Sequence, residues 1–243
     1  MIMYINPPHK TSKKETKMNT IQQNKKADVQ VAKAVKKASV IYLFFKRAFD
    51  IVSSFFALIF ISPLFLVISL LIKFEDGGKV FYSHERIGKN GKRIKIHKFR
   101  SMVKNSQDLT TLLTPEQLEQ YQKEFKIDND PRITKIGKFL RTTSLDELPQ
   151  LWDIFTGKIS VVGPRPLVEQ EIELYYNDAK EAFLSCKPGL TGYWQAYARN
   201  NATYETGERQ KMEMFYVNNR SLWLDIKILF KTVISVITRK GAK

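Results

Sequence analysis

Two adjacent carboxylates, Asp146 and Glu147, are the strongest candidates for reactive groups in this sequence. A carboxylate can act as a nucleophile toward phosphorus, and it is also a ligand that Mg²⁺ prefers beside phosphate groups. The Ser144-x-x-Glu147 spacing also fits a capping box, in which the acids would only stabilise a helix start. Pro149 disfavours that alternative, because it would fall inside such a helix and instead suits a helix that begins there. Four nearby cations could neutralise phosphate charge during a transfer: Arg132, Lys135, Lys138 and Arg141.

Three further basic residues stand in settings that suit phosphate binding. Arg165 lies between Pro164 and Pro166, and a rigidly held guanidinium is suited to bidentate contacts with phosphate. Lys98 and Arg100 follow a basic segment and form another candidate anion site. The alternative for each residue is an ordinary surface cation. We therefore treat these three as candidate substrate-binding residues.

An uncharged apolar segment, residues 51–72, indicates the class of protein. A straight helix of this length spans roughly 33 Å, which is enough for the hydrocarbon core of a bilayer. The alternative is a buried helix of a soluble domain. Such helices usually keep a polar face, and this segment has almost none.

Ser62 and Pro63 interrupt the middle of this segment. Proline removes a backbone donor and kinks a helix, and the Ser62 hydroxyl can bond a freed carbonyl. Both flanks are rich in Lys and Arg, and such flanks tend to stay cytoplasmic. We therefore expect a re-entrant helix–break–helix over residues 41–73, which enters and leaves the membrane on one side. A kinked helix that crosses the bilayer is the alternative.

The fold class that we expect is α+β and mainly helical, with a cytoplasmic catalytic domain over residues 74–240. Gly88–Gly91 predicts a hairpin turn, and Thr114 with Gln117 predicts a capping box. The last helix is amphipathic and would lie in the membrane interface or pack on the protein's own core. The expected elements are strands at 80–82 and 93–99, helices at 114–126 and 149–155, a strand at 159–162 and a helix at 222–239.

The net charge of +16 over 243 residues points to a polyanionic partner. Residues 1–40 form a basic tail that we expect to be disordered, or drawn to anionic membrane lipid, with a Lys-rich helix conceivable at 27–40. The single cysteine, Cys186, excludes an intrachain disulfide and is expected to be a small core residue. A membrane-anchored nucleic-acid-binding protein and a non-enzymatic membrane scaffold are the rival functions. We see no recognised nucleic-acid-binding module and expect no nucleic-acid partner.

Several motifs, in order and at fitting distances, resemble the bacterial polyprenyl-phosphate hexose-1-phosphate transferases, also called monotopic phosphoglycosyl transferases. The resemblance covers roughly residues 44 to 238. Any one of these motifs is weak, but together they are specific. They are Lys46-Arg47 with Asp50, Ser62-Pro63, Glu85-Arg86-Ile87-Gly88, Lys98-Phe99-Arg100-Ser101-Met102, Leu140-Arg141 with Thr143-Ser144-Leu145-Asp146-Glu147-Leu148-Pro149-Gln150-Leu151, Val162-Gly163-Pro164-Arg165-Pro166 and Lys187-Pro188-Gly189-Leu190-Thr191-Gly192.

The resemblance implies a Mg²⁺ requirement, a UDP-sugar donor and a two-step reaction. Asp146 would attack the sugar-bearing phosphate and release UMP, and the phosphosugar would then pass to undecaprenyl phosphate. Glu147 would help to hold the metal or handle the acceptor's proton, and Asp146 is itself a candidate metal ligand. Arg141 and Arg165 would hold donor phosphates, with Lys98 as a further candidate.

The resemblance also implies a place in the cell and in a pathway. The protein would lie in the bacterial cytoplasmic (inner) membrane, with its catalytic domain on the cytoplasmic face. It would perform the first membrane step in the synthesis of exopolysaccharide, capsule, lipopolysaccharide or another glycoconjugate. A homodimer is compatible with these features.

This chain departs from the family pattern in several places. The family often carries a larger multi-span region before the catalytic part, whereas this chain has a basic tail and so resembles the small catalytic form. Glu213 stands where the family usually has Asp, and Gly207 and Arg220 are also atypical. One extra methylene at Glu213 could shift a metal or donor contact. The sequence therefore does not identify the sugar.

Overall fold

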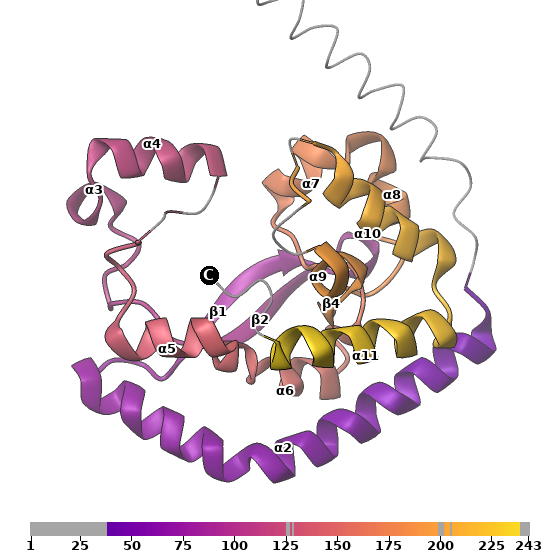
Figure 1. The fold of residues 1–243 in the computed structure, drawn as a ribbon, viewed down its shortest axis with the longest axis horizontal. Helices are drawn as coiled ribbons and strands as arrows, with labels where there is room; N and C mark the ends of the chain where they lie inside the picture. Colours follow the sequence, from indigo (N-terminus) through magenta and orange to yellow (C-terminus); the bar gives the residue numbers. More distant parts are fainter. Residues whose placement is uncertain (1–37, 125–126, 128, 199–201, 205, 239–243) are drawn as a thin grey trace, which may run out of the picture.

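The computed structural model describes residues 38–124, 127, 129–198, 202–204 and 206–238. This part of the chain is mostly helical, with two small two-stranded sheets, which confirms the α+β, mainly helical class (Figure 1). The tail expected at 1–40 lies outside the described residues except for its last three. The Lys-rich helix expected at 27–40 also lies outside the described residues, apart from residues 38–40.

The elements follow one another along the chain with short connections. They are α2 (Val40–Asp76), β1 (Phe81–Ile87), η1 (Lys89–Gly91), β2 (Arg93–Phe99), α3 (Leu109–Leu112), α4 (Pro115–Glu124), α5 (Lys135–Thr143), η2 (Leu145–Glu147), α6 (Gln150–Phe155), β3 (Ser160–Val162), α7 (Glu169–Tyr175), η3 (Asn177–Ala179), α8 (Lys180–Phe183), β4 (Gly189–Thr191), α9 (Tyr193–Ala198), α10 (Glu208–Asn219) and α11 (Leu222–Ile237).

The apolar segment forms one continuous helix, α2, which is 37 residues long. The expected break at Ser62 and Pro63 is instead a bend, and Figure 1 shows both arms of α2 rising toward the rest of the domain. Pro63 has no N–H for the carbonyl of Ile59, and the Ser62 hydroxyl donates to that carbonyl at 2.8 Å. The helix continues because the one lost backbone bond is replaced locally.

Most of the surface of α2 is exposed and apolar. The helix is long and apolar enough to cross a membrane, and only 11% of its most apolar stretch is buried within the protein. Phe60 and Phe74, for example, are 79% and 81% exposed. The core helix of a soluble domain would be mostly buried, so this exposure disfavours the soluble alternative. The narrow buried side of α2 packs against α5, α6, α11 and β3.

The β1–β2 hairpin forms as the turn residues predict. The two strands pair antiparallel, with Phe81 opposite Phe99 and Ile87 opposite Arg93. Asn90 at the tip has a φ of 58°, the left-handed conformation that asparagine tolerates. The inner face of β2 is buried, so the hairpin packs on the domain.

The other local predictions are confirmed with small shifts in their ends. Thr114 and Gln117 form the reciprocal capping box at the start of α4, with N–H···O distances of 3.1 and 3.3 Å. Four elements differ by one or two residues from the predicted bounds within the described part of the chain: α4, α6, β3 and α11. The strand predicted at 80–82 is longer than expected, because β1 continues to Ile87. The strand β4, which pairs parallel with β3, was not predicted.

Candidate active site

The two candidate carboxylates lie in a single 3-10 turn between α5 and α6. Ser144 ends α5 in the left-handed conformation, with a φ of 58°, and Pro149 precedes the first residue of α6. The Ser144 side chain makes no capping hydrogen bond. The capping-box alternative is therefore not what the structure shows, and Asp146 and Glu147 lie in the turn before α6, as Pro149 predicts.

Asp146 is a buried carboxylate with cations beside it. Only 8% of the residue is exposed, and its Oδ2 lies 3.8 Å from the Lys98 ammonium. The same ammonium is 2.7 Å from Glu147 Oε1. Burial raises the pKa of Asp146, as does the charge of Glu147, while Lys98 and Arg141 act in the opposite direction. A desolvated carboxylate with cations beside it is suited to nucleophilic attack in its ionised form.

Arg141 reaches this site from the last turn of α5 and is fixed by Ser101. Its Nε donates to the Ser101 hydroxyl at 2.8 Å. The carbonyl of Ser101 accepts from the N–H of Thr134, the N-cap of α5, at 3.2 Å. Gly137 packs directly on this backbone: a Cβ there would lie 2.7 Å from the Ser101 carbonyl carbon. Ser101, which sequence reasoning did not single out, therefore anchors α5 and orients Arg141.

A fully buried acid, Asp153, fixes the strand that carries Lys98. Its carboxylate accepts from the backbone N–H of His97 at 2.7 Å and lies 2.7 Å from the Nδ1 of the same residue. Lys158 adds an ion pair at 2.9 Å. Lys98 follows His97 directly, so this clamp between α6 and β2 holds the ammonium near the carboxylates. No sequence signal identified Asp153, because its partner lies 56 positions away.

Two of the basic residues named from the sequence have structural partners. Arg100 pairs with Asp76 at the end of α2, with a hydrogen bond of 2.7 Å from its Nη1. Arg132 pairs with Asp130 at 2.6 Å. The structure therefore uses Arg100 to join β2 to α2, and its predicted role in substrate binding gains no support.

The two glycine-containing motifs on either side of Arg165 meet in the β3–β4 pair. Gly163 N–H donates to the Thr191 carbonyl and Gly189 N–H to the Pro164 carbonyl, both at 2.9 Å. The backbones approach so closely that a Cβ on Gly163 would lie 2.5 Å from the Lys187 carbonyl oxygen. Glycine is therefore required here by space. The contact gives the proline-flanked turn a rigid base.

Arg165 belongs to a second polar cluster. Its backbone N–H lies 3.3 and 3.4 Å from the two carboxylate oxygens of Glu213, which is 1% exposed. Burial raises the pKa of Glu213 to about 7, while Arg209 and Arg165 act against it. Burial and the charge of Arg165 lower the pKa of Arg86. The structure thus unites Asp146, Glu147, Lys98 and Arg141, and no hydrogen bond or ion pair among the described residues joins Arg165 to Asp146.

The carboxylate pair is compatible with a magnesium ion held partly by substrate. No group of three or more His, Cys, Asp or Glu side chains among the described residues could hold a metal ion by itself. Mg²⁺ is commonly bound by one or two carboxylates together with phosphate oxygens and waters. Asp146 and Glu147 supply that minimal donor set, and their mutual repulsion would be relieved by a cation.

Comparison with known proteins decides the family. The model of the family described as "Bacterial sugar transferase" matches residues 41–239. The chain belongs to this family. The undecaprenyl-phosphate galactose phosphotransferase of Salmonella typhimurium is 48% identical over 202 residues, which is 82% of this chain and 42% of that protein. The exopolysaccharide production protein ExoY of Rhizobium meliloti is 46% identical over 200 residues, 81% of this chain and 87% of ExoY.

A third relative carries a different sugar in its name. The UDP-glucose:undecaprenyl-phosphate glucose-1-phosphate transferase of Klebsiella pneumoniae is 40% identical over 210 residues, 83% of this chain and 42% of that protein. The chain therefore spans less than half the length of several curated relatives that it matches, and most of the length of ExoY.

Proposed function

We propose that this chain transfers a sugar-1-phosphate from a UDP-sugar to undecaprenyl phosphate, giving undecaprenyl-diphospho-sugar and UMP. The observation that carries the proposal is the buried Asp146 carboxylate, which lies 3.8 Å from the Lys98 ammonium and feels the charge of Arg141. The same domain carries α2, a long exposed apolar helix that suits a lipid-linked acceptor. The names of the relatives, two of which combine undecaprenyl phosphate with transfer of a sugar phosphate, support this choice of substrates.

The proposed reaction has two displacements at one phosphorus atom. An Asp146 carboxylate oxygen attacks the phosphorus that bears the sugar, and the bond from that phosphorus to the UMP oxygen breaks. UMP leaves with the bonding electrons, and an acyl phosphate forms on Asp146. A phosphate oxygen of undecaprenyl phosphate then attacks the same phosphorus, and the bond to Asp146 breaks. The carboxylate is regenerated, so the protein is unchanged after one cycle.

The surrounding side chains support charge movement in both steps. The Lys98 ammonium and the Arg141 guanidinium stabilise the charge that develops on the phosphoryl oxygens. Arg165, on its rigid turn, is proposed to hold a donor phosphate. Asp146 and Glu147 would hold Mg²⁺, which would neutralise phosphate charge when bound. Glu147 would help to hold the metal or handle the proton of the acceptor.

The membrane placement that we propose is re-entrant, in the cytoplasmic membrane and with the catalytic domain on its cytoplasmic side. The bend in α2 and the basic flanks of that helix support it. Helix α11 exposes Trp223 and Phe230, which are 65% and 70% accessible, while it buries Asp225 and Ile228. An outer face of this kind suits the membrane interface. Labelling of single cysteines placed in the two flanks of α2, in intact and lysed cells, tests this: opposite accessibility would show a crossing helix.

The test of the reaction is UMP release from a panel of UDP-sugars with undecaprenyl phosphate and Mg²⁺. Wild-type protein is expected to release UMP with at least one donor, and Asp146→Asn is expected to release none. Asp108→Asn is the matched control, because Asp108 is an exposed cap of α3 and Asn caps helices equally well. Unchanged release by Asp146→Asn would refute the assignment. Cellular function that survives Asp146→Asn would favour the scaffold alternative.

A further inference from the structure

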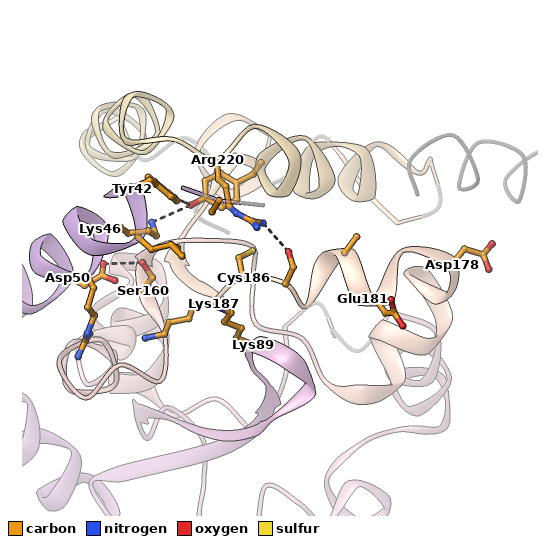
Figure 2. A pocket seen from close by; sticks show the side chains of 16 residues that line it. Tyr42, Lys46, Asp50, Lys89, Ser160, Asp178, Glu181, Cys186, Lys187 and Arg220 are labelled. Atoms are coloured by element: carbon orange, nitrogen blue, oxygen red, sulfur yellow. Dashed lines mark hydrogen bonds between the residues drawn. The ribbon is translucent and has the colours of Figure 1, made fainter. Parts of the chain in front are cut away.

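A cavity of about 830 Å³ lies beside the first arm of α2 and is separate from the carboxylate site. Figure 2 shows its lining side chains, which come from α2, the hairpin tip and the region around α8. Lys89 at the hairpin tip lines the cavity, whereas Lys98 near the other end of β2 contacts the carboxylates. Because β2 is seven residues long, these two places are roughly 20 Å apart along the strand.

The cavity carries an excess of positive charge. Its two exposed acids, Asp178 and Glu181, lie at the end away from Lys46 and Lys187 (Figure 2). The third acid, Asp50, is 2% exposed and accepts hydrogen bonds from Ser160 Oγ and Val161 N. The five lining cations are Lys46, Arg47, Lys89, Lys187 and Arg220.

Three of these cations lie together, and the buried Asp50 is the acid of the cavity that acts on Lys187 and Arg47. The Lys187 ammonium and the Arg47 guanidinium both pack over Gly157, at 3.3 and 3.1 Å from the position of a Cβ on that glycine. Burial and the charges of Arg47 and Lys89 lower the pKa of Lys187, while the charge of Asp50 acts in the opposite direction. Within the described part of the chain, no ion pair involves Lys89, Lys187 or Arg47. Like charges held together in this way favour an anion between them.

The cations are fixed by contacts that do not neutralise them. Arg47 donates to the carbonyls of Ile154 and Phe155 at 2.8 Å each. The hairpin tip is tied to the end of α8 by a hydrogen bond of 2.8 Å from Asn90 N to the Leu184 carbonyl. This tether fixes the backbone next to Lys89. The cavity is therefore a preformed basic site, and a ligand need not pay much ordering entropy to be bound there.

Arg220 gives the same cavity a further donor. Its Nη1 bonds the Ser185 hydroxyl at 3.0 Å, while its buried Nε has no hydrogen-bond partner among the described residues. A buried donor without a partner is unfavourable, and an anion that enters the cavity could accept from it.

We propose that this cavity binds the phosphate of an anionic phospholipid headgroup. Phosphate is the anion that Lys and Arg clusters with adjacent hydroxyls bind well. A lipid is the favoured source because the charged lining of the cavity lies beside the exposed apolar side of α2: Leu43 lines the cavity, and Phe44 next to it is 68% exposed. The acyl chains of a phospholipid can lie along that apolar arm, whereas a free phosphate has no apolar part to contact it. The inference uses the proposed membrane placement and is independent of the transfer reaction.

The test is native mass spectrometry of the full chain in detergent, titrated with phosphatidylglycerol and, separately, with phosphatidylcholine. Wild-type protein is expected to bind one phosphatidylglycerol at least ten-fold more tightly than phosphatidylcholine. Lys89→Gln with Lys187→Gln removes two cations, each of which contributes roughly a five-fold factor, so the affinity for phosphatidylglycerol should fall roughly 25-fold and the preference over phosphatidylcholine should be lost. Lys92→Gln with Lys95→Gln removes the same charge from exposed positions that do not line the cavity, and should leave the preference unchanged.

Each further arm of the experiment has a decisive result. Equal loss in the two double variants would show non-specific attraction and overturn the proposal. Displacement of phosphatidylglycerol by millimolar inorganic phosphate or UDP-sugar would assign the cavity to a soluble phosphate and also overturn it. Asp146→Asn is expected to retain the lipid, so a failure of the proposed transferase reaction leaves this test readable. Lys89→Glu, at the exposed hairpin tip, repeats the test with little risk to folding.

Discussion

Gly137→Ala tests whether the packing of α5 on Ser101 sets the position of the reactive carboxylate. A Cβ on Gly137 would lie 2.7 Å from the Ser101 carbonyl carbon and 2.8 Å from its Cα. Carbon atoms pack best at roughly 3.5–4.0 Å, so α5 would have to move away from β2 by roughly 1 Å. This movement displaces Arg141 and, through the turn at Ser144, Asp146.

Two effects on stability oppose each other in this variant. Replacing a helical glycine by alanine stabilises an exposed helix by about 1 kcal/mol, whereas overpacking costs about 1–3 kcal/mol. The net loss should be at most about 2 kcal/mol, or a few degrees in Tm for a chain of this size. The effect on rate should be larger, because a 1 Å misplacement of a catalytic group can reduce the rate about 100-fold.

The assay is UMP release under the conditions proposed above, together with thermal unfolding of the same preparations. Gly137→Ala is expected to release UMP about 100-fold more slowly while it remains folded. Thr142→Ala is the matched control on the same helix, because Thr142 is exposed and its hydroxyl bonds only the Lys138 carbonyl of α5. A Gly137→Ala protein with full activity and a raised Tm would refute the argument that this contact positions the site.

Three other substitutions test the charges. Asp146→Asn should raise the Tm at pH 7, because burial raises the pKa of Asp146 and the folded state opposes its ionisation. The gain in Tm should vanish as the pH falls to about 4, where the carboxyl is protonated in the unfolded chain too. A lower Tm at pH 7 would contradict this prediction. Glu213 has a pKa of about 7 when folded, so its stabilising effect is complete below about pH 4.5 and is lost as the pH rises through 7; Glu213→Gln should remove this part of the pH dependence in an unfolding series. Lys46→Met leaves Asp225, whose side chain is 9% exposed and 2.7 Å from the Lys46 ammonium, without its cation. The free energy of unfolding measured in denaturant should fall by about 3–5 kcal/mol. The double variant Lys46→Met with Asp225→Asn should recover part of that free energy.

Local signals were sufficient for the parts of the site that depend on neighbouring residues. Pro149 placed the carboxylates in the turn before α6, and the Asn-Gly pair at 90–91 placed the hairpin. The capping box at Thr114 was also correct. In each case the determining contacts lie within three or four residues, so spacing and residue type contain the information.

The partners that orient the site are distant in sequence and could not be predicted this way. Ser101 bonds Arg141 across 40 positions, and Asp153 bonds His97 across 56. Arg100 was considered a phosphate ligand from its charge and position, and its ion pair with Asp76 at the end of α2, 24 positions earlier, was not predicted. A single sequence gives the charge of such a residue but not the element that will neutralise it.

The end of α2 joins the long apolar helix to the candidate active site. Ile68 and Ile72 of its second arm share a hydrophobic cluster with Leu140 of α5, and the leucines on both sides of the carboxylate pair, Leu145 and Leu148, pack against that cluster. Two polar contacts reinforce this packing. Asp76 at the end of α2 pairs with Arg100, and Glu75 accepts a hydrogen bond from the backbone N–H of Ile136 in α5. The phosphate of a membrane lipid lies at a fixed depth, near the interface. In the proposed reaction Asp146 must meet that phosphate and so needs a fixed depth too. That depth follows from the packing of η2 against the second arm of α2. Under the proposed function, the exposed apolar helix is therefore part of the active-site architecture as well as an anchor, because its position determines where Asp146 lies relative to the lipid.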